Sequence, residues 1–238
     1  SLNANTEGDY NTAVGRSALG GNTTADYNTA AGYHALVDNT TGANNTGIGA
    51  FALSNNTTAS ENTAVGYEAM LTNTTGHSNT AIGRRNMRST TTGTRNTSVG
   101  FNSMYYNTSG ADNVGVGNSA LQGNTTGEGN VAIGREALLN NTTASKNTAV
   151  GFNALHSNTT ASNNTAVGYQ AGYLINTSSY NTILGRQSGY QLAASTGLNL
   201  MVGNQAGYYT TSGTHNTFVG GNLSGHYVTT GSKNTLLG

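Results

Sequence analysis

Residues 147–160 read Asn-Thr-Ala-Val-Gly-Phe-Asn-Ala-Leu-His-Ser-Asn-Thr-Thr, and variants of this stretch fill the whole chain. The glycine of the Asn-Thr-Ala-Val-Gly pentapeptide first stands at Gly15 and recurs every 17 residues as far as Gly185, followed by Gly203, Gly220 and Gly238. An asparagine precedes each of these glycines by four residues in all fourteen copies. A fixed period of this size indicates a repeat architecture.

The pentapeptide carries the alternation of a β-strand. Its second position is Thr or Val in most copies and its fourth is Val, Ile or Leu, whereas the third is small in most copies. Val131 and Ile133 show the second and fourth positions both apolar. This period of two predicts a short strand whose second and fourth side chains face the core. We expect a second short strand around pairs such as Ala18-Leu19.

A unit of 17 residues is too short for a pair of helices, and its apolar residues lack helical spacing. Stacked units can cover each other's apolar faces. The chain therefore reads as an all-β parallel solenoid, or β-roll, of about fourteen coils. We divide it into regular repeats at 1–170 and a continuation at 171–238. In the continuation Gly-Tyr replaces the leucine of the Ala-Leu pair, as in Ala171-Gly172-Tyr173, and the cross-section is expected to change. With coils about 4.8 Å apart, the array would be on the order of 65 Å long.

Two repeat columns predict structural ladders. A glycine at the end of each strand indicates a corner with positive φ or a close approach of the next coil. An asparagine in each coil can cap the turn and hydrogen-bond to its counterparts in neighbouring coils. These ladder residues include Asn11, Asn28, Asn45, Asn62, Asn79, Asn96, Gly15, Gly32, Gly49, Gly66, Gly83 and Gly100.

The pentapeptides at 79–83 and 130–134, Asn-Thr-Ala-Ile-Gly and Asn-Val-Ala-Ile-Gly, resemble the head repeats of YadA-like trimeric autotransporter adhesins. The full unit resembles repeat arrays of bacterial and phage tail-fibre proteins. The resemblance covers nearly the whole chain and implies a left-handed β-roll, three chains side by side, displayed outside a cell or on a virion. The thin core of one Val and one Leu per coil also points to an oligomer. Both ends lie within the repeat register, so we expect a segment of a longer protein.

The composition of the chain argues against several classes of function. Nine basic residues balance nine acidic ones, so the chain lacks the positive charge of a nucleic-acid binder. No apolar run is long enough to span a membrane, and we expect no membrane insertion. The carboxylates and histidines are scattered over different columns, which predicts solvated side chains, no metal, no cofactor and no enzymatic site. They include Glu61, Glu68, Glu128, Glu136, His34, His77, His156, His215 and His226.

A column directly after the glycine is rich in aromatic residues and arginines. It is expected to form a structural stack or an interchain contact, or else a stripe on which sugars lie. Its members are Arg16, Tyr33, Tyr67, Arg84, Phe101, Arg135, Phe152, Tyr169 and Arg186.

A turn column consists of asparagines in Asn-x-Ser/Thr sequons. We interpret them as ordinary turn residues, with partial glycosylation as the alternative, since coils about 5 Å apart leave little room for a glycan on each. They are Asn22, Asn39, Asn56, Asn73, Asn107, Asn124, Asn141 and Asn158.

These patterns predict a non-enzymatic, extracellular fibre or adhesin segment whose partners are copies of itself and a surface glycan or protein receptor. Two alternatives stay open. Thr12, Thr29, Thr46 and their equivalents form a threonine column like those that can match ice, although Val114, Val131 and Leu200 replace threonine there and indicate an inward-facing column. Coils can also stack end to end into an open filament.

Overall fold

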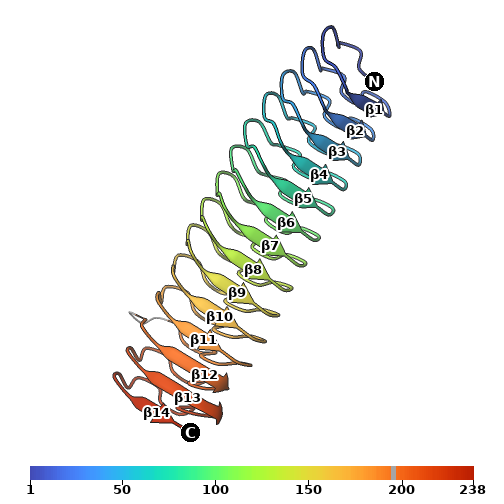
Figure 1. Ribbon diagram of the computed structural model, residues 1–238. Coiled ribbons are helices and arrows are strands. Elements are labelled where there is room, and N and C mark those ends of the chain that lie inside the picture. Colours follow the sequence, from blue (N-terminus) through green and yellow to red (C-terminus); the bar gives the residue numbers. More distant parts are fainter. Residues whose placement is uncertain (194–196) are drawn as a thin grey trace. The chain divides into compact units, whose positions relative to one another are not determined.

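The computed structural model describes residues 1–193 and 197–238, so the predicted segment 171–238 is described apart from 194–196. The described chain is all-β, without a helix, and forms a parallel β-solenoid of about thirteen turns with one strand per repeat (Figure 1). The fourteen strands follow one another in a single sheet in chain order. They are β1 (Thr12–Val14), β2 (Thr29–Ala31), β3 (Thr46–Ile48), β4 (Thr63–Val65), β5 (Thr80–Ile82), β6 (Thr97–Val99), β7 (Val114–Val116), β8 (Val131–Ile133), β9 (Thr148–Val150), β10 (Thr165–Val167), β11 (Thr182–Leu184), β12 (Leu200–Asn204), β13 (Thr217–Asn222) and β14 (Thr235–Leu237).

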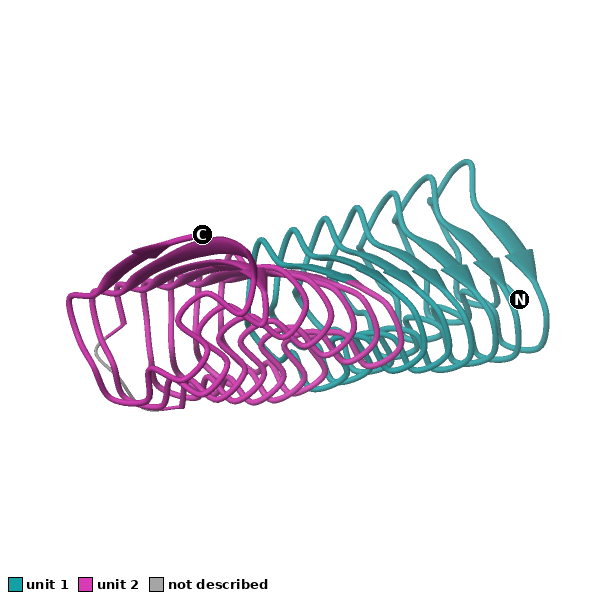
Figure 2. Ribbon diagram, turned by 90° about the horizontal axis from the view of Figure 1, so that it is seen from below, with its two compact units in different colours: residues 1–115 teal, residues 116–238 magenta. Residues whose placement is uncertain are grey.

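The strands pair in register with the sequence repeat. Thr63 of β4 lies beside Thr80 of β5, and Val65 lies beside Ile82. In the paired strands, residues therefore lie beside their own equivalents in the next coil, with a shift between β12 and β13 after Val202, which confirms the predicted parallel solenoid. The chain divides into two compact units, residues 1–115 and 116–238, shown in teal and magenta in Figure 2. Each unit carries the same coil.

The strand side chains face in the direction opposite to that predicted. The third residue of the pentapeptide is buried, as at Ala64, while Thr63 and Val65 on either side are partly exposed. The reason is the leucine on the opposite wall of the coil. A Cβ built on Gly47 would lie 3.2 Å from the Leu36 Cγ, so the interior has room for only a small residue from the strand. The alternation was predicted correctly, but the inward assignment of Thr and Val was wrong.

The predicted second strand around Ala-Leu is also absent from the described coils, where this segment is a turn. Ser17 and Leu19 both adopt left-handed conformations, with φ of 58° and 49°. Alternate left-handed residues prevent an extended strand. The segment still bonds to the next coil, since the Leu19 amide donates to the Ala35 carbonyl at 3.0 Å.

The glycine corners are confirmed. Gly66 has a φ of +136°, and a Cβ added there would lie 2.4 Å from the carbonyl oxygen of Gly83 in the next coil. Only glycine satisfies both the backbone conformation and this close approach.

The asparagine ladder is confirmed as well. The backbone amide of Asn45 donates to the Asn28 side-chain oxygen at 2.9 Å, and the Asn45 side-chain amide donates to the Ala59 carbonyl at 2.8 Å. The same bonds recur in the second unit, where the Asn147 backbone amide donates to the side-chain oxygen of Asn130 at 3.0 Å. An asparagine that makes both bonds, such as Asn45, thus satisfies a buried turn carbonyl and joins two coils, whereas the side-chain nitrogen of Asn28 is buried without a partner.

The core changes at Gly172, within the second unit. Gly172, Gly189 and Gly207 occupy the left-handed position that leucine holds in earlier coils, with φ of 61°, 57° and 60°. The strand residue opposite grows from alanine to Ile183, Met201 and Phe218, all fully buried. A Cβ on Gly207 would lie 2.6 Å from the Met201 sulfur. The space of the lost leucine is therefore filled from the strand.

Candidate interaction surface

The described residues contain no group of three or more His, Cys, Asp or Glu side chains arranged to hold a metal ion. A search of the same residues for an apolar helix long enough to cross a membrane finds none.

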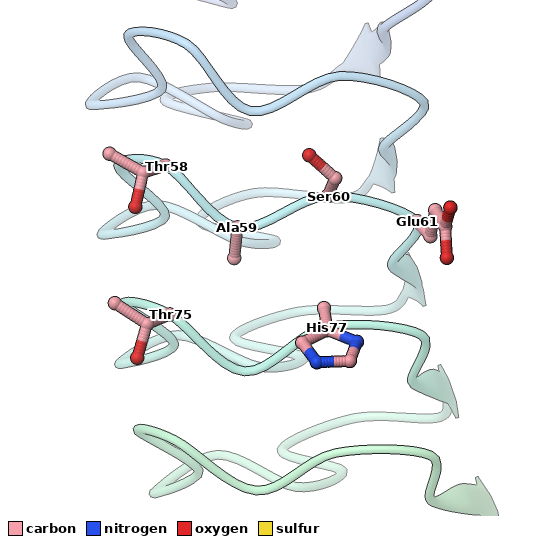
Figure 3. Close-up of a pocket in the computed structure, with 6 residues that line it drawn as sticks. All are labelled: Thr58, Ala59, Ser60, Glu61, Thr75 and His77. Carbon is pink, nitrogen blue, oxygen red and sulfur yellow. The ribbon is translucent and has the colours of Figure 1, made fainter.

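A groove of about 430 Å³ lies on the loops that precede β4 and β5, lined by Thr58, Ala59, Ser60, Glu61, Thr75 and His77 (Figure 3). Beside it the Ser78 hydroxyl donates to a Glu61 carboxylate oxygen at 2.8 Å, and the His77 Nδ1 lies 3.2 Å from the same hydroxyl. The serine hydroxyl thus donates to the carboxylate, and the tautomer of His77 decides whether its Nδ1 donates to this hydroxyl or accepts from it. Glu61 and His77 are exposed, so the groove offers polar contacts without a water-excluding pocket.

Glu68 departs from the expected solvated surface. Its side chain is only 13% exposed and bridges Arg85 and Arg88, at 3.1 and 2.8 Å. Burial raises the pKa of Glu68, but hydrogen bonds from Arg88, Tyr67 and Arg85 outweigh this effect and hold the pKa below its usual value. The carboxylate therefore ties neighbouring coils together as a structural ion pair.

In the structure, the aromatic and arginine side chains of the column after the glycine form short stacks. In the second unit, Phe152 and Tyr169 stack with ring centroids 5.5 Å apart, and the guanidinium carbons of Arg135 and Arg186 lie 5.6 and 5.9 Å from the rings at the two ends. In the first unit, Arg84 lies between Tyr67 and Phe101, while Arg16 lies over Tyr33. Sugars stack on open ring faces, and the faces of Phe152 and Tyr169 are covered by their neighbours. The geometry favours the structural reading of this column over a sugar stripe.

A second aromatic stack, which was not predicted from the sequence, includes the tyrosines of the Gly-Tyr pairs. His156, Tyr173, Tyr190, Tyr208 and His226 stack in sequence, with successive centroids 4.8, 5.1, 5.0 and 5.4 Å apart. The signal was present as aromatic residues one repeat apart. Burial lowers the pKa of His156, which the charge of Glu136 opposes, and burial also raises the pKa of Tyr190.

The sequon asparagines lie inside the coils and form a second ladder. The Asn56 side-chain amide donates to the Asn39 side-chain oxygen and to the Ala59 carbonyl, both at 2.9 Å. All eight sequon asparagines are fully buried. Glycosylation requires access to that amide nitrogen, so the folded chain does not support the glycosylation alternative, and the asparagines act as turn residues.

The outer side of the sheet is a regular surface. We define the strand face as the second and fourth residues of the pentapeptides. It holds Thr, Val, Ile, Leu and Ala, and no charged residue. Ile48, Ile82 and Ile133 are each about 40% exposed (42%, 40% and 40%). In the first unit it comprises Thr12, Val14, Thr29, Ala31, Thr46, Ile48, Thr63, Val65, Thr80, Ile82, Thr97, Val99 and Val114, and in the second Val116, Val131, Ile133, Thr148, Val150, Thr165, Val167, Thr182, Leu184, Leu200, Val202, Thr217, Val219, Thr235 and Leu237.

Comparisons with known proteins identify no relative of this chain. No family model, curated protein or solved structure matches the chain. The resemblance to YadA-like head repeats stays a prediction from the repeat motif.

Proposed function

We propose that the chain is a segment of a non-enzymatic extracellular fibre or adhesin, exposed on a cell or virion surface. In this proposal three identical chains, each a left-handed coil, lie side by side and supply length, stiffness and display toward a glycan or protein receptor. The supporting observation is the in-register repetition of the coil, in which strand residues lie beside their equivalents in the next repeat and ladder asparagines such as Asn45 hydrogen-bond to theirs.

Three sets of contacts join successive coils and make the array suited to a mechanical role. The strands pair through their backbones, as between Thr148 and Thr165. One asparagine ladder runs along the strand starts, and the other joins turn residues such as Asn124 and Asn141 at 2.8 Å. Repeat arrays of this kind gain stability from nearest-neighbour contacts, so length can be added without a new core.

The test is the native mass in solution, measured by light scattering coupled to size exclusion. The fibre proposal expects three times the chain mass of 24.3 kDa. A single-chain mass would overturn the trimer. A broad distribution of high mass would instead indicate coils that polymerise end to end.

Ice binding is the second candidate, because the structure removes the objection that the threonine column faces inward. Thr46 and Thr80 lie on the outer side of the sheet. Among the described residues, the strand-face threonines make no side-chain hydrogen bond to the protein. Regularly spaced hydroxyl and methyl groups on stiff β-branched side chains can order water. Faceted growth of ice crystals in the presence of the purified single chain would support this candidate, and unshaped growth would exclude it.

A further inference from the structure

We propose that the strand face is the surface through which copies of this chain meet in the fibre. The inference rests on the proposed function and adds to it the residues that make the contact. Its occupant is a second copy of the chain, running parallel and aligned coil to coil.

The first argument is the exclusion of charge from an exposed surface. Other exposed columns carry charges, as at Glu61, Arg95 and Lys146 in the position before the ladder asparagine. The strand face has none in any repeat, although Ile48 and Ile82 are as exposed as many charged side chains. Depletion of charge with retention of apolar side chains is typical of the centre of a protein interface.

The second argument comes from the threonine hydroxyls. Threonines in the turns are used within the chain, since the Thr40 hydroxyl donates to the Thr57 carbonyl at 3.0 Å. Those of the strand face, such as Thr63 and Thr80, have no such protein partner in the described structure. A hydroxyl both donates and accepts, so threonines of aligned chains can satisfy one another. Such pairs would favour one register between chains, because a shift that placed a hydroxyl against a valine would leave it unpaired.

The third argument is area. Fourteen strands spaced about 4.8 Å apart, each with two outward side chains, present on the order of 600 Å². A standard interface buries about 800 Å² per partner. Each chain of a trimer meets two neighbours, so the strand face supplies less than half of this area toward each of them, and the side chains at its margins supply the rest. A threefold axis along the coils would bring same-numbered residues to the same level.

The test compares two double variants by light scattering. Val65→Glu with Ile82→Glu places charges on the strand face. Asn44→Glu with Asn163→Glu is the matched control, because both sites share the exposed left-handed column in which Glu61 already stands, at φ of 59°, 60° and 62°. We expect the strand-face variant at single-chain mass with an unchanged circular dichroism spectrum, and the control at threefold mass.

The outcomes separate the two proposals. If the unmodified chain is threefold and the strand-face variant stays threefold, the interface is overturned while the fibre stands. If the unmodified protein has a single-chain mass, the fibre proposal is overturned and the interface proposal with it. Ice shaping by that single chain would then indicate that the strand face binds ice. Should the glutamate variant unfold, Val65→Ala with Ile82→Ala decides. It removes apolar atoms from the strand face without adding a hydroxyl that could pair between chains. It is expected to raise the dissociation constant at least tenfold, and an unchanged constant would overturn the interface.

Discussion

The coils up to Leu155 and those from Gly172 onward have the same backbone course, but the large side chain that fills the coil interior comes from the turn in the first group and from the strand in the second. In the earlier coils a leucine or methionine of the turn meets a small strand residue, as Leu36 meets Gly47. In the later coils glycine stands in the turn and a large strand residue fills the space, as at Gly172 and Ile183. The comparison shows that the repeat conserves the summed volume of a pair eleven residues apart rather than either residue.

The second asparagine ladder separates the same two regions. It ends at Asn158, because Ile175 and Leu192 take its place in the following coils and are fully buried. The side-chain oxygen of Asn158 is left without a hydrogen-bond partner, and so is that of Asn73, which faces Thr90 in the next coil. The two coils after Asn158 thus place apolar residues where the ladder asparagines stood, and the ladder leaves an unsatisfied oxygen at Asn73 and at Asn158, where it stops.

The largest expected effect on stability concerns the glycine corner, which both regions share. Gly66→Ala and Gly185→Ala should each destabilise the chain by roughly 2–6 kcal/mol, because strain at positive φ and a clash with backbone each cost about 1–3 kcal/mol. A Cβ would lie 2.4 and 2.3 Å from the carbonyl oxygen of the next coil. Urea unfolding measures the loss. Gly221→Ala is the control, since nothing lies within 4 Å of its added Cβ, and equal losses in all three variants would contradict the assignment.

A double-mutant cycle tests the exchange of volume. Leu53→Gly should cost about 2–5 kcal/mol through the cavity it leaves. Ala64→Ile should cost about 1–3 kcal/mol through overpacking. Together they recreate the pair Gly172 and Ile183, so the double variant should be more stable than the sum by about 1–3 kcal/mol. Additive losses in denaturant unfolding would show that the two residues do not share one space.

The broken ladder predicts a stabilising substitution. Thr90→Asn should give the Asn73 oxygen a donor and restore the ladder within the first unit, raising the free energy of unfolding by about 1–3 kcal/mol. Thr90 is fully buried, and its own hydroxyl lacks a partner in the structure. A higher midpoint of thermal unfolding would support the prediction, whereas a lower one would mean that the larger amide does not fit.

The smallest effect concerns pH. Burial lowers the pKa of His156 in the folded chain, so the unfolded chain binds more protons at acid pH. The stability due to neutral His156 is fully present above its ordinary pKa of about 6.5 and is lost as pH falls through the lowered folded value. The unfolding midpoint should fall less between neutral and mildly acid pH in His156→Tyr, which places there the residue found at Tyr173. An identical fall would contradict this role.

Much of the fold followed from the repeat itself. The period predicted the coil and its register, and the glycine and asparagine columns predicted the corners and one ladder, because each has a single backbone requirement. The direction of the strand side chains could not be obtained this way. Both faces of the strand are uncharged, and only the leucine across the coil decides that Ala64 and not Val65 fits inside. The candidate surface was missed for the same reason, since the pattern placed its threonines in the core.

The most direct test of the account is a disulfide across one coil. The chain contains no cysteine, so a pair introduced at Leu36 and Gly47 can bond only within the chain or between its copies. The Cβ built on Gly47 lies 3.2 Å from the Leu36 Cγ, close to the separation that a disulfide needs. Oxidation of the native Leu36→Cys, Gly47→Cys variant should give a rapid intrachain bond, detected by thiol capping and mass spectrometry. Leu36→Cys with Ile48→Cys should keep free thiols or link separate chains. A rapid intrachain bond in the second pair and none in the first would place the valine and isoleucine column inside the coil and contradict the account.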